Sequence, residues 1–244
     1  MESKEKNVLT ILLIIIVVVI IGIIGYLSYE VISQNSKQKH SEEISDEFDR
    51  LVPTISEDEY EEQYGSENLP QESPQPSEPE NSNGGGGNGN SSVKKASSGG
   101  SGTGSSSVSV GGYWVMGTIR IPATGIKYSI LSTPTRQALE RGVAVLYTAN
   151  GLNQPGNTVI VGHNYRNRLF FSKNKNLKNG DKVIIKDATG LEITYTIYNK
   201  FTTNSEDASF FQRDTNGKRE ITLSTCTDQG TKTGERIIIF ARAD

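Results

Sequence analysis

The sequence has little of the chemistry that metal centres and disulfides need. Its 244 residues include one cysteine, Cys226, and two histidines, His40 and His163. One cysteine excludes an intrachain disulfide and any zinc or iron–sulfur site built from several cysteines of one chain. Two histidines exclude a histidine-rich metal centre. We therefore predict no metal and no cofactor.

Apolar residues are also scarce, at 34% of the chain, which is low for a protein that is globular throughout. The charges divide unevenly between two parts of the chain. Residues 1–107 carry 7 Lys/Arg and 17 Asp/Glu, whereas residues 108–244 carry 18 Lys/Arg and 11 Asp/Glu. An acidic first part joined to a basic second part indicates segments with different functions.

One long apolar run stands at the beginning of the chain. Residues 8–27 contain no charged side chain, and a helix of that length spans roughly 30 Å, the thickness of a bilayer core. The run is longer than the core of a signal peptide and lacks a small-x-small cleavage site, which favours an uncleaved anchor over a cleaved signal. Lys4 and Lys6 precede it, so we expect residues 1–7 in the cytoplasm and the rest outside.

Residues 28–110 have the composition of a disordered tether. Between 41 and 80 there are 14 acidic residues against a single basic one, Arg50, and residues 81–112 contain 11 glycines among many Ser and Asn. Such segments cannot bury enough apolar surface to offset chain entropy. We predict a passive spacer, extended in its Pro/Glu part and flexible in its Gly/Ser part.

The residue pattern changes in 111–244, where short apolar runs with strand periodicity alternate with turn signals. One short helix is expected over 134–141, with Thr133 as its N-cap. The pattern predicts a mainly β domain that closes into an eight-stranded barrel, with one or two short helices, because closure removes exposed strand edges. The expected strands cover residues 117–122, 126–131, 142–147, 157–163, 182–187, 191–201, 219–226 and 235–243.

Three residues that carry reactive groups lie at ends of these strands. His163 follows an apolar strand, Cys226 ends another and Arg236 begins the last one. A cysteine with a histidine is the minimal thiol catalyst, and an arginine can hold a developing oxyanion. Each also has an ordinary interpretation, because a lone cysteine is usually a small buried apolar residue and a lone histidine is usually structural.

The motifs around these residues resemble those of the sortases. The resemblance rests on TLSTC at 222–226, VGHN at 161–164, Arg236 at the start of the last strand, and GTIRIPATGIKYSIL at 117–131. It covers about residues 113–243. The membrane anchor and the expected extracellular orientation agree with it independently. Sortases are cell-surface transpeptidases of Gram-positive bacteria with an eight-stranded barrel.

The resemblance implies an activity and partners. Cys226 would cleave an LPxTG-like sorting signal of secreted proteins after its Thr, forming a thioacyl intermediate. An amine of a peptidoglycan precursor or a pilin would then accept the acyl group. His163 would act as general acid and base, and Arg236 would hold the substrate carbonyl. Thr225 and the amide of Thr227 would support the substrate or the oxyanion.

The class of sortase is less well determined by these motifs. The 63 residues from His163 to Cys226 leave no room for the long additional helix that is typical of class B. TLSTC is similar to patterns of both class B and class D, and the short domain with its long tether favours a class D-like enzyme, with class B-like second. Acidic residues gather in 202–219, but the partner loop 148–157 has none, so we predict no calcium site.

Two other functions remain open from the sequence. A thiol peptidase would cleave without transfer, because water can replace the amine. A non-enzymatic, tethered surface-binding module would use its basic domain on anionic wall polymers. The domain lacks a basic helix and an aromatic platform motif, so we expect no nucleic-acid partner. Membrane lipid would contact residues 8–27, and the oligomeric state is left open.

Overall fold

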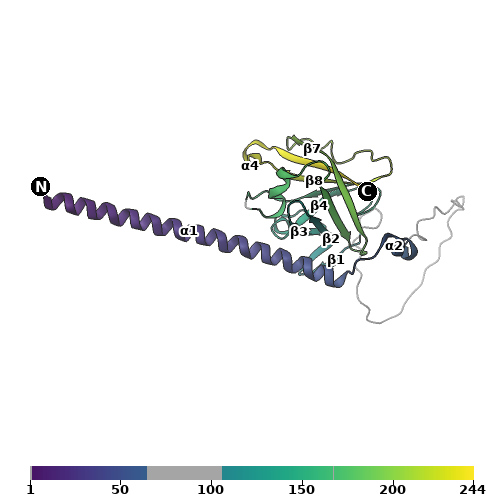
Figure 1. Cartoon of the computed structure of the whole chain (residues 1–244), viewed down its shortest axis with the longest axis horizontal. Helices are drawn as coiled ribbons and strands as arrows, with labels where there is room; N and C mark the ends of the chain where they lie inside the picture. Colours follow the sequence, from purple (N-terminus) through teal and green to yellow (C-terminus); the bar gives the residue numbers. More distant parts are fainter. Residues whose placement is uncertain (1, 65–105, 167) are drawn as a thin grey trace, which may run out of the picture.

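The computed structural model describes residues 2–64, 106–166 and 168–244. A single long helix leads into a β-barrel, and short helices lie at the barrel's periphery (Figure 1). Along the chain the elements are α1 (Glu2–Leu51), α2 (Glu57–Tyr64), β1 (Val108–Val110), β2 (Tyr113–Ile121), β3 (Ile126–Leu131), α3 (Arg136–Leu139), β4 (Val143–Thr148), β5 (Gly156–Val161), the 3-10 helix η2 (Phe170–Asn176), β6 (Lys182–Asp187), β7 (Glu192–Thr203), β8 (Arg219–Cys226), α4 (Gly230–Thr233) and β9 (Arg236–Ala243).

Eight strands close the barrel, as the sequence predicts. Their order is β2-β3-β4-β5-β8-β9-β7-β6, and β6 pairs back onto β2. The pairs β3–β4 and β5–β8 are parallel and the others are antiparallel. A strand that the sequence analysis missed, β1, pairs with the first residues of β2, before the part of β2 that pairs with β6.

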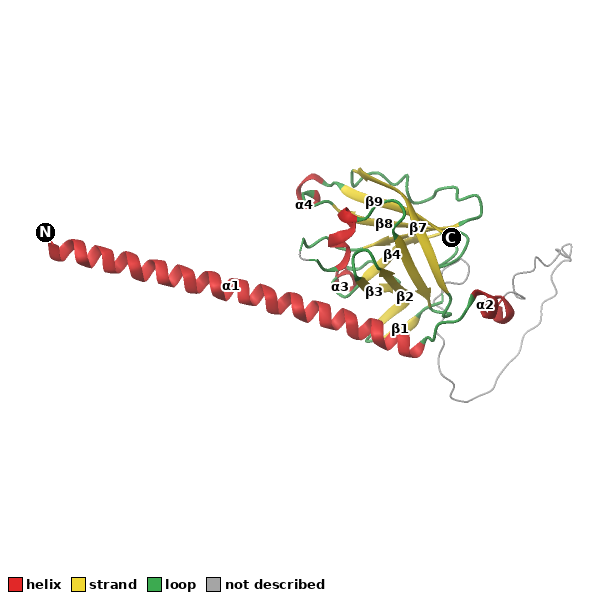
Figure 2. Cartoon of the chain, in the orientation of Figure 1, coloured by secondary structure: helices red, strands yellow, loops and turns green. Residues whose placement is uncertain are grey.

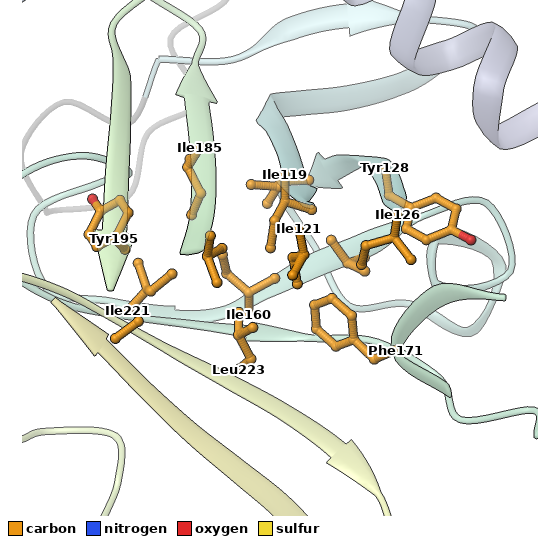
Figure 3. Packing of buried hydrophobic residues seen from close by; sticks show 14 of the residues in the cluster. Ile119, Ile121, Ile126, Tyr128, Ile160, Phe171, Ile185, Tyr195, Ile221 and Leu223 are labelled. Carbon is orange, nitrogen blue, oxygen red and sulfur yellow. The ribbon is translucent and has the colours of Figure 1, made fainter. Parts of the chain in front are cut away.

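Apolar side chains from strands all around the barrel fill its interior. Figure 3 shows Ile119, Ile160, Ile185 and Leu223 converging from different strands, and each of them is fully buried. In β7 the alternation predicted from the sequence is confirmed. Ile193, Tyr195 and Ile197 are all buried there. This rigid core fixes the ends of the strands, where the candidate residues lie.

The short helix α3 begins later than predicted. Its N-cap is Thr135 rather than Thr133, since the Thr135 hydroxyl accepts a hydrogen bond from the Ala138 amide at 3.1 Å. Pro134 therefore precedes the cap instead of occupying the first turn. The physical reason is that an N-cap residue is extended and directly precedes the first helical residue; Thr135 has φ −68° and ψ 157°, and the helix begins at Arg136.

The structure differs from the predicted tether over residues 28–64. Helix α1 continues through the acidic segment to Leu51, and α2 follows it (Figure 2). The remaining Pro-, Gly- and Ser-rich part of the predicted tether, 65–105, lies outside the described residues. Within α1, the most apolar 18-residue window has a mean hydropathy of 3.2 and no part of it is buried, so the helix is long and apolar enough to cross a membrane.

The reason for the difference is an apolar stripe that a count of charges conceals. Five buried residues recur at helical spacing, three of them apolar and two of them serines: Ile44, Phe48, Val52, Ser41 and Ser45. Ile44, Phe48 and Val52 pack in a second cluster against apolar residues of the barrel wall. Burial of that face stabilises a helix that its acidic composition alone would not.

Charge complementarity adds to this contact. Lys127 pairs with Asp46 at 3.1 Å and with Asp49 at 2.7 Å, and Lys186 pairs with Asp49 at 2.5 Å. Lys186 also donates to the carbonyl of Val52 at 2.9 Å. Two acidic residues of this segment, Asp46 and Asp49, therefore lie opposite lysines of the barrel, and α1 is docked on the barrel before the chain leaves the described residues at 64.

Candidate active site

The parallel pairing of β5 with β8 brings His163 and Cys226 to the same end of the barrel. Val161 and Ser224 are cross-strand partners, and His163 and Cys226 each follow two residues later. The Gly162 amide still donates to the Ser224 carbonyl at 3.2 Å, so the two chains remain side by side beyond the ladder. The sequence shows two strand ends, and the fold makes them neighbours.

Arg236 reaches the same place through the antiparallel pairing of β8 with β9. Cys226 and Arg236 are the last partners in that ladder. Directly opposite residues in an antiparallel pair present their side chains on the same face of the sheet. All three side chains are half-buried, which leaves each of them accessible to a substrate from one side.

The glycine before the histidine is required by packing. A Cβ on Gly162 would lie 2.8 Å from the Phe171 ring and 2.9 Å from Val143. Only a residue without a side chain lets the chain pass this close to the core just before His163. A second close approach occurs at Gly230, where a Cβ would lie 2.9 Å from the Cβ of Cys226.

The half-buried His163 imidazole lies in mixed electrostatic surroundings. Burial lowers the pKa of His163 below its usual value; Glu140 opposes that effect, and the positive charges of Lys37 and Arg136 add to it. The ring of Tyr165 lies 4.8 Å from the imidazole, centroid to centroid, at 34°. At neutral pH these surroundings favour the neutral imidazole, the form that can accept a proton.

Thr225 has a different place from the one expected of it. Its side chain is buried, and its hydroxyl donates to the Gly162 carbonyl at 2.8 Å. The hydroxyl therefore links the residue before Cys226 to the residue before His163. Its effect on the site is to hold the two strand ends in register.

The amide of Thr227, expected to support the oxyanion, takes part in a backbone turn in this structure. That N–H donates to the Glu235 carbonyl at 3.0 Å. It closes the connection between β8 and β9, and Gly230 in turn donates to the Thr227 carbonyl. A backbone N–H already engaged in a turn is not available to an oxyanion, so Arg236 is the donor nearest to Cys226 in the ladder.

Sequence reasoning missed a polar link at the rim of the site. The Asn164 side-chain amide donates to the Cys226 carbonyl and to Asp228, both at 3.0 Å. Lys175 pairs with Asp228 at 2.6 Å. Hydrogen bonds from Lys175 and Asn164 lower the pKa of the Asp228 carboxyl. The only sequence feature that could have indicated this link is the closeness of both residues to the candidate residues: Asn164 follows His163, and Asp228 comes two residues after Cys226.

Two acidic side chains between β7 and β8 accept hydrogen bonds from residues close to them in sequence. Asp207 accepts from the Thr203 hydroxyl at 2.7 Å, and Asp214 accepts from the Asn216 amide at 2.8 Å. Across residues 2–64, 106–166 and 168–244, no group of three or more His, Cys, Asp or Glu side chains is arranged to hold a metal ion.

Comparison with known proteins gives a family match over the barrel. A family model described as "Sortase domain" matches residues 119–244. No curated protein matches the sequence significantly. The matched part contains His163, Cys226 and Arg236, and begins within β2.

Solved structures of similar proteins are sortases. Sortase A from Corynebacterium diphtheriae, in a lid mutant, has 26% sequence identity and a TM-score of 0.48, over 53% of this chain and 70% of that one. A Clostridium perfringens Sortase D5 transpeptidase has 25% identity and a TM-score of 0.47, over 53% and 79%. Sortase C from Clostridium perfringens SM101 has 23% identity and a TM-score of 0.46, over 53% and 70%.

Proposed function

The chain belongs to the sortase family, and from that premise we propose that it is a membrane-anchored cysteine transpeptidase in which Cys226, His163 and Arg236 carry the reaction. The observation that supports these roles best is the pairing of the strand ends. Parallel β5–β8 and antiparallel β8–β9 bring a thiol, an imidazole and a guanidinium to one end of a rigid barrel.

In the first half of the proposed reaction, the Cys226 sulfur attacks the carbonyl carbon of the Thr in an LPxTG-like signal. Arg236 donates hydrogen bonds to the carbonyl oxygen as its negative charge grows. His163, as the neutral imidazole, accepts the thiol proton of Cys226 and delivers it to the leaving amine. The C–N bond breaks, the C-terminal fragment leaves, and a thioester joins the substrate to Cys226.

In the second half, an amine attacks the thioester carbonyl. His163 accepts the proton that the amine loses, and the thiolate of Cys226 leaves and is reprotonated. The product carries a new amide bond, and the enzyme returns to its starting state. The acceptor in this proposal is an amine of a peptidoglycan precursor or a pilin. We favour a class D-like enzyme, with class B-like second.

The proposed location follows from α1. Residues 8–27 would cross the membrane with Lys4 and Lys6 on the cytoplasmic side. The barrel would then lie outside the cell, where secreted proteins and wall precursors occur. The lone cysteine has no partner with which to form an intrachain disulfide, so it stays available as a nucleophile.

The experiment uses the full chain in lipid nanodiscs with fluorescent peptides of the forms LPxTG, LPxTA and NPxTN. Triglycine or a diaminopimelate-type amine is added in excess, and products are followed by mass spectrometry. A Thr-acyl product joined to the amine, absent with Cys226→Ala, is the expected result and ranks the signals. Retention of transfer by Cys226→Ala would contradict the covalent mechanism.

The same experiment separates the alternatives. Cleavage that yields only the free acid, whatever the amine concentration, identifies a thiol peptidase without transfer. Absence of cleavage and of any thioacyl adduct from the folded chain identifies a surface-binding module. In that case Cys226 would be a structural residue and His163→Ala would leave binding unchanged.

A further inference from the structure

Helix α1 reaches the end of the barrel that carries the candidate active site. Its Lys37 ammonium lies 4.9 Å from the centroid of the Tyr165 ring and 4.0 Å from the Glu140 carboxylate. Figure 2 shows α1 running past the side of the barrel where α3 lies. Lys37 follows the proposed membrane span by only ten residues, about 15 Å along a helix.

The Tyr165 ring is held between this lysine, the imidazole and the core. Its centroid lies 4.8 Å from that of His163 and 5.9 Å from that of Phe170. Phe170 is buried and packs against Tyr128 at 5.1 Å. A cation over a tyrosine face attracts the ring electrostatically, so Lys37 acts on the side of the ring that the core leaves open.

We propose that Tyr165 is a positioning residue for the His163 imidazole and that Lys37 of α1 holds Tyr165 in place, so that the anchor helix contributes directly to the support of the active site. The importance of this support for catalysis rests on the proposed function. The physical link between α1 and His163 can be measured without any reaction. Neither Lys37 nor Tyr165 touches the substrate in this proposal.

The charges around His163 determine in which direction its pKa moves when Lys37 is lost. Lys37 of α1, Arg136 of α3 and Glu140 at the C-cap of α3 act on the charge of His163, and Cys226 and Arg236 stand at the neighbouring strand ends. Loss of Lys37 removes a positive charge and leaves Glu140 without its ion-pair partner. Both changes favour the protonated imidazole, so the pKa of His163 rises.

The two histidines make the test direct. The full chain, labelled with carbon-13 at the histidine ring carbon between the two nitrogens, is placed in lipid nanodiscs and titrated by NMR. Two signals are expected, from His40 and His163. Lys37→Met is compared with Lys39→Met, which removes an exposed lysine of the same helix. We expect the His163 midpoint to move upward in Lys37→Met and to stay in place in Lys39→Met.

Tyr165 is tested with a pair of substitutions. Tyr165→Phe keeps the ring and should leave both the His163 titration and kcat/KM close to those of the unchanged protein. Tyr165→Leu removes the ring; the His163 midpoint should rise because the imidazole gains solvent, and the misplaced imidazole should lower kcat/KM roughly tenfold, with most of the loss in kcat. The His40 signal should not respond to either change.

An unchanged His163 midpoint in folded Lys37→Met and Tyr165→Leu would overturn the proposal. If Tyr165→Leu does not fold, Lys37→Met still tests the link from α1 to His163, because Lys37 is partly exposed and its loss leaves the core intact. A shifted midpoint without transpeptidation would support this inference and reject the proposed function. Transpeptidation with unshifted His163 midpoints would support the proposed function and reject this inference.

Discussion

Cys226 and Arg236 are directly opposite one another, as the last pair of residues in the ladder between β8 and β9. The two residues are ten positions apart in sequence, yet backbone pairing fixes their separation more firmly than side-chain contacts would. The guanidinium is therefore presented beside the thiol by the sheet itself. Any change in this ladder changes their relative position.

Arg236→Lys should lower kcat/KM by about 10²–10³-fold, the cost of losing a donor to a developing oxyanion. Lysine keeps the charge but lacks the planar fork of donors. Transfer assays on the full chain measure the effect. Arg219→Lys is the matched control, because Arg219 begins β8 at the opposite end of the barrel and pairs with Glu57. Equal losses in the two variants would contradict the role of Arg236.

Thr225→Val should reduce stability by about 1–3 kcal/mol, because it leaves the buried Gly162 carbonyl without its side-chain donor. It should also lower kcat, since the strand ends that carry His163 and Cys226 lose their link. Thr225→Ser keeps the hydroxyl and should restore most of both. Denaturant melts and transfer rates give the comparison, and a fully active Thr225→Val would show that the link is dispensable.

His163 should make stability depend on pH in a defined window. Burial lowers its pKa below the ordinary value of 6.5, so the unfolded chain takes up a proton before the folded chain does. The stability supplied by the neutral imidazole is present above about 6.5 and is lost as the pH falls from there through the folded pKa. Comparison of melting temperatures at pH 7.5 and pH 5.5 tests this.

His163→Gln provides the reference for that comparison. Other groups respond to acid in both proteins, including Asp49, whose hydrogen bonds and ion pairs with Lys127 and Lys186 hold its pKa low against the opposing effect of burial. The difference between the two proteins isolates His163. The melting temperature of the unchanged protein should fall further on acidification than that of His163→Gln. Equal falls would mean that His163 is not desolvated as the structure has it.

Phe48→Ala should weaken the docking of α1 on the barrel. Phe48 is fully buried, and truncation of a buried phenylalanine costs about 3–5 kcal/mol. Hydrogen exchange of residues 41–52 in the full chain should become much faster. Leu51→Ala, three residues later and half-exposed at 51%, should leave exchange unchanged. Equal protection in both variants would place the stabilising contacts elsewhere.

The single cysteine offers a test of orientation in the membrane. Cys226 is half-buried and is the only thiol of the chain. A membrane-impermeant maleimide added to intact cells should label it if the barrel lies outside, and Cys226→Ala should remain unlabelled. Labelling that requires permeabilised cells would reverse the proposed topology.

The sequence was sufficient to predict the barrel and to place His163, Cys226 and Arg236 at or next to strand ends, because both depend on local signals. Alternation marks strands such as β7, and a reactive residue at the end of an apolar strand can be recognised without its neighbours. Pairing partners could not be obtained in this way. The link from Thr225 to Gly162 and the use of the Thr227 amide depend on which strands are adjacent, and that is a property of the whole fold.

The segment after the apolar run shows where composition misleads. Counting charges over residues 41–80 predicts disorder, yet Ile44, Phe48 and Val52 lie on one helical face that the barrel covers. Two of the acidic residues that argued against structure, Asp46 and Asp49, are the partners of Lys127 and Lys186. A periodicity analysis restricted to residues 41–52 would have found the stripe, although not the surface that it contacts.

The chain contacts the barrel on both sides of residues 65–105. Before them, Ile55 bridges to Leu191 and the Tyr60 hydroxyl accepts from Gln154; after them, β1 pairs with β2. In the proposed membrane-anchored form, the length of 65–105 therefore does not govern the distance between the barrel and the bilayer. That distance is set by the helical residues from Ser28 to Lys37, where α1 reaches Glu140 of the barrel, about 15 Å at 1.5 Å per residue. A protease cut within 65–105 would leave two fragments that remain associated, so membrane retention of the barrel would survive the loss of covalent continuity.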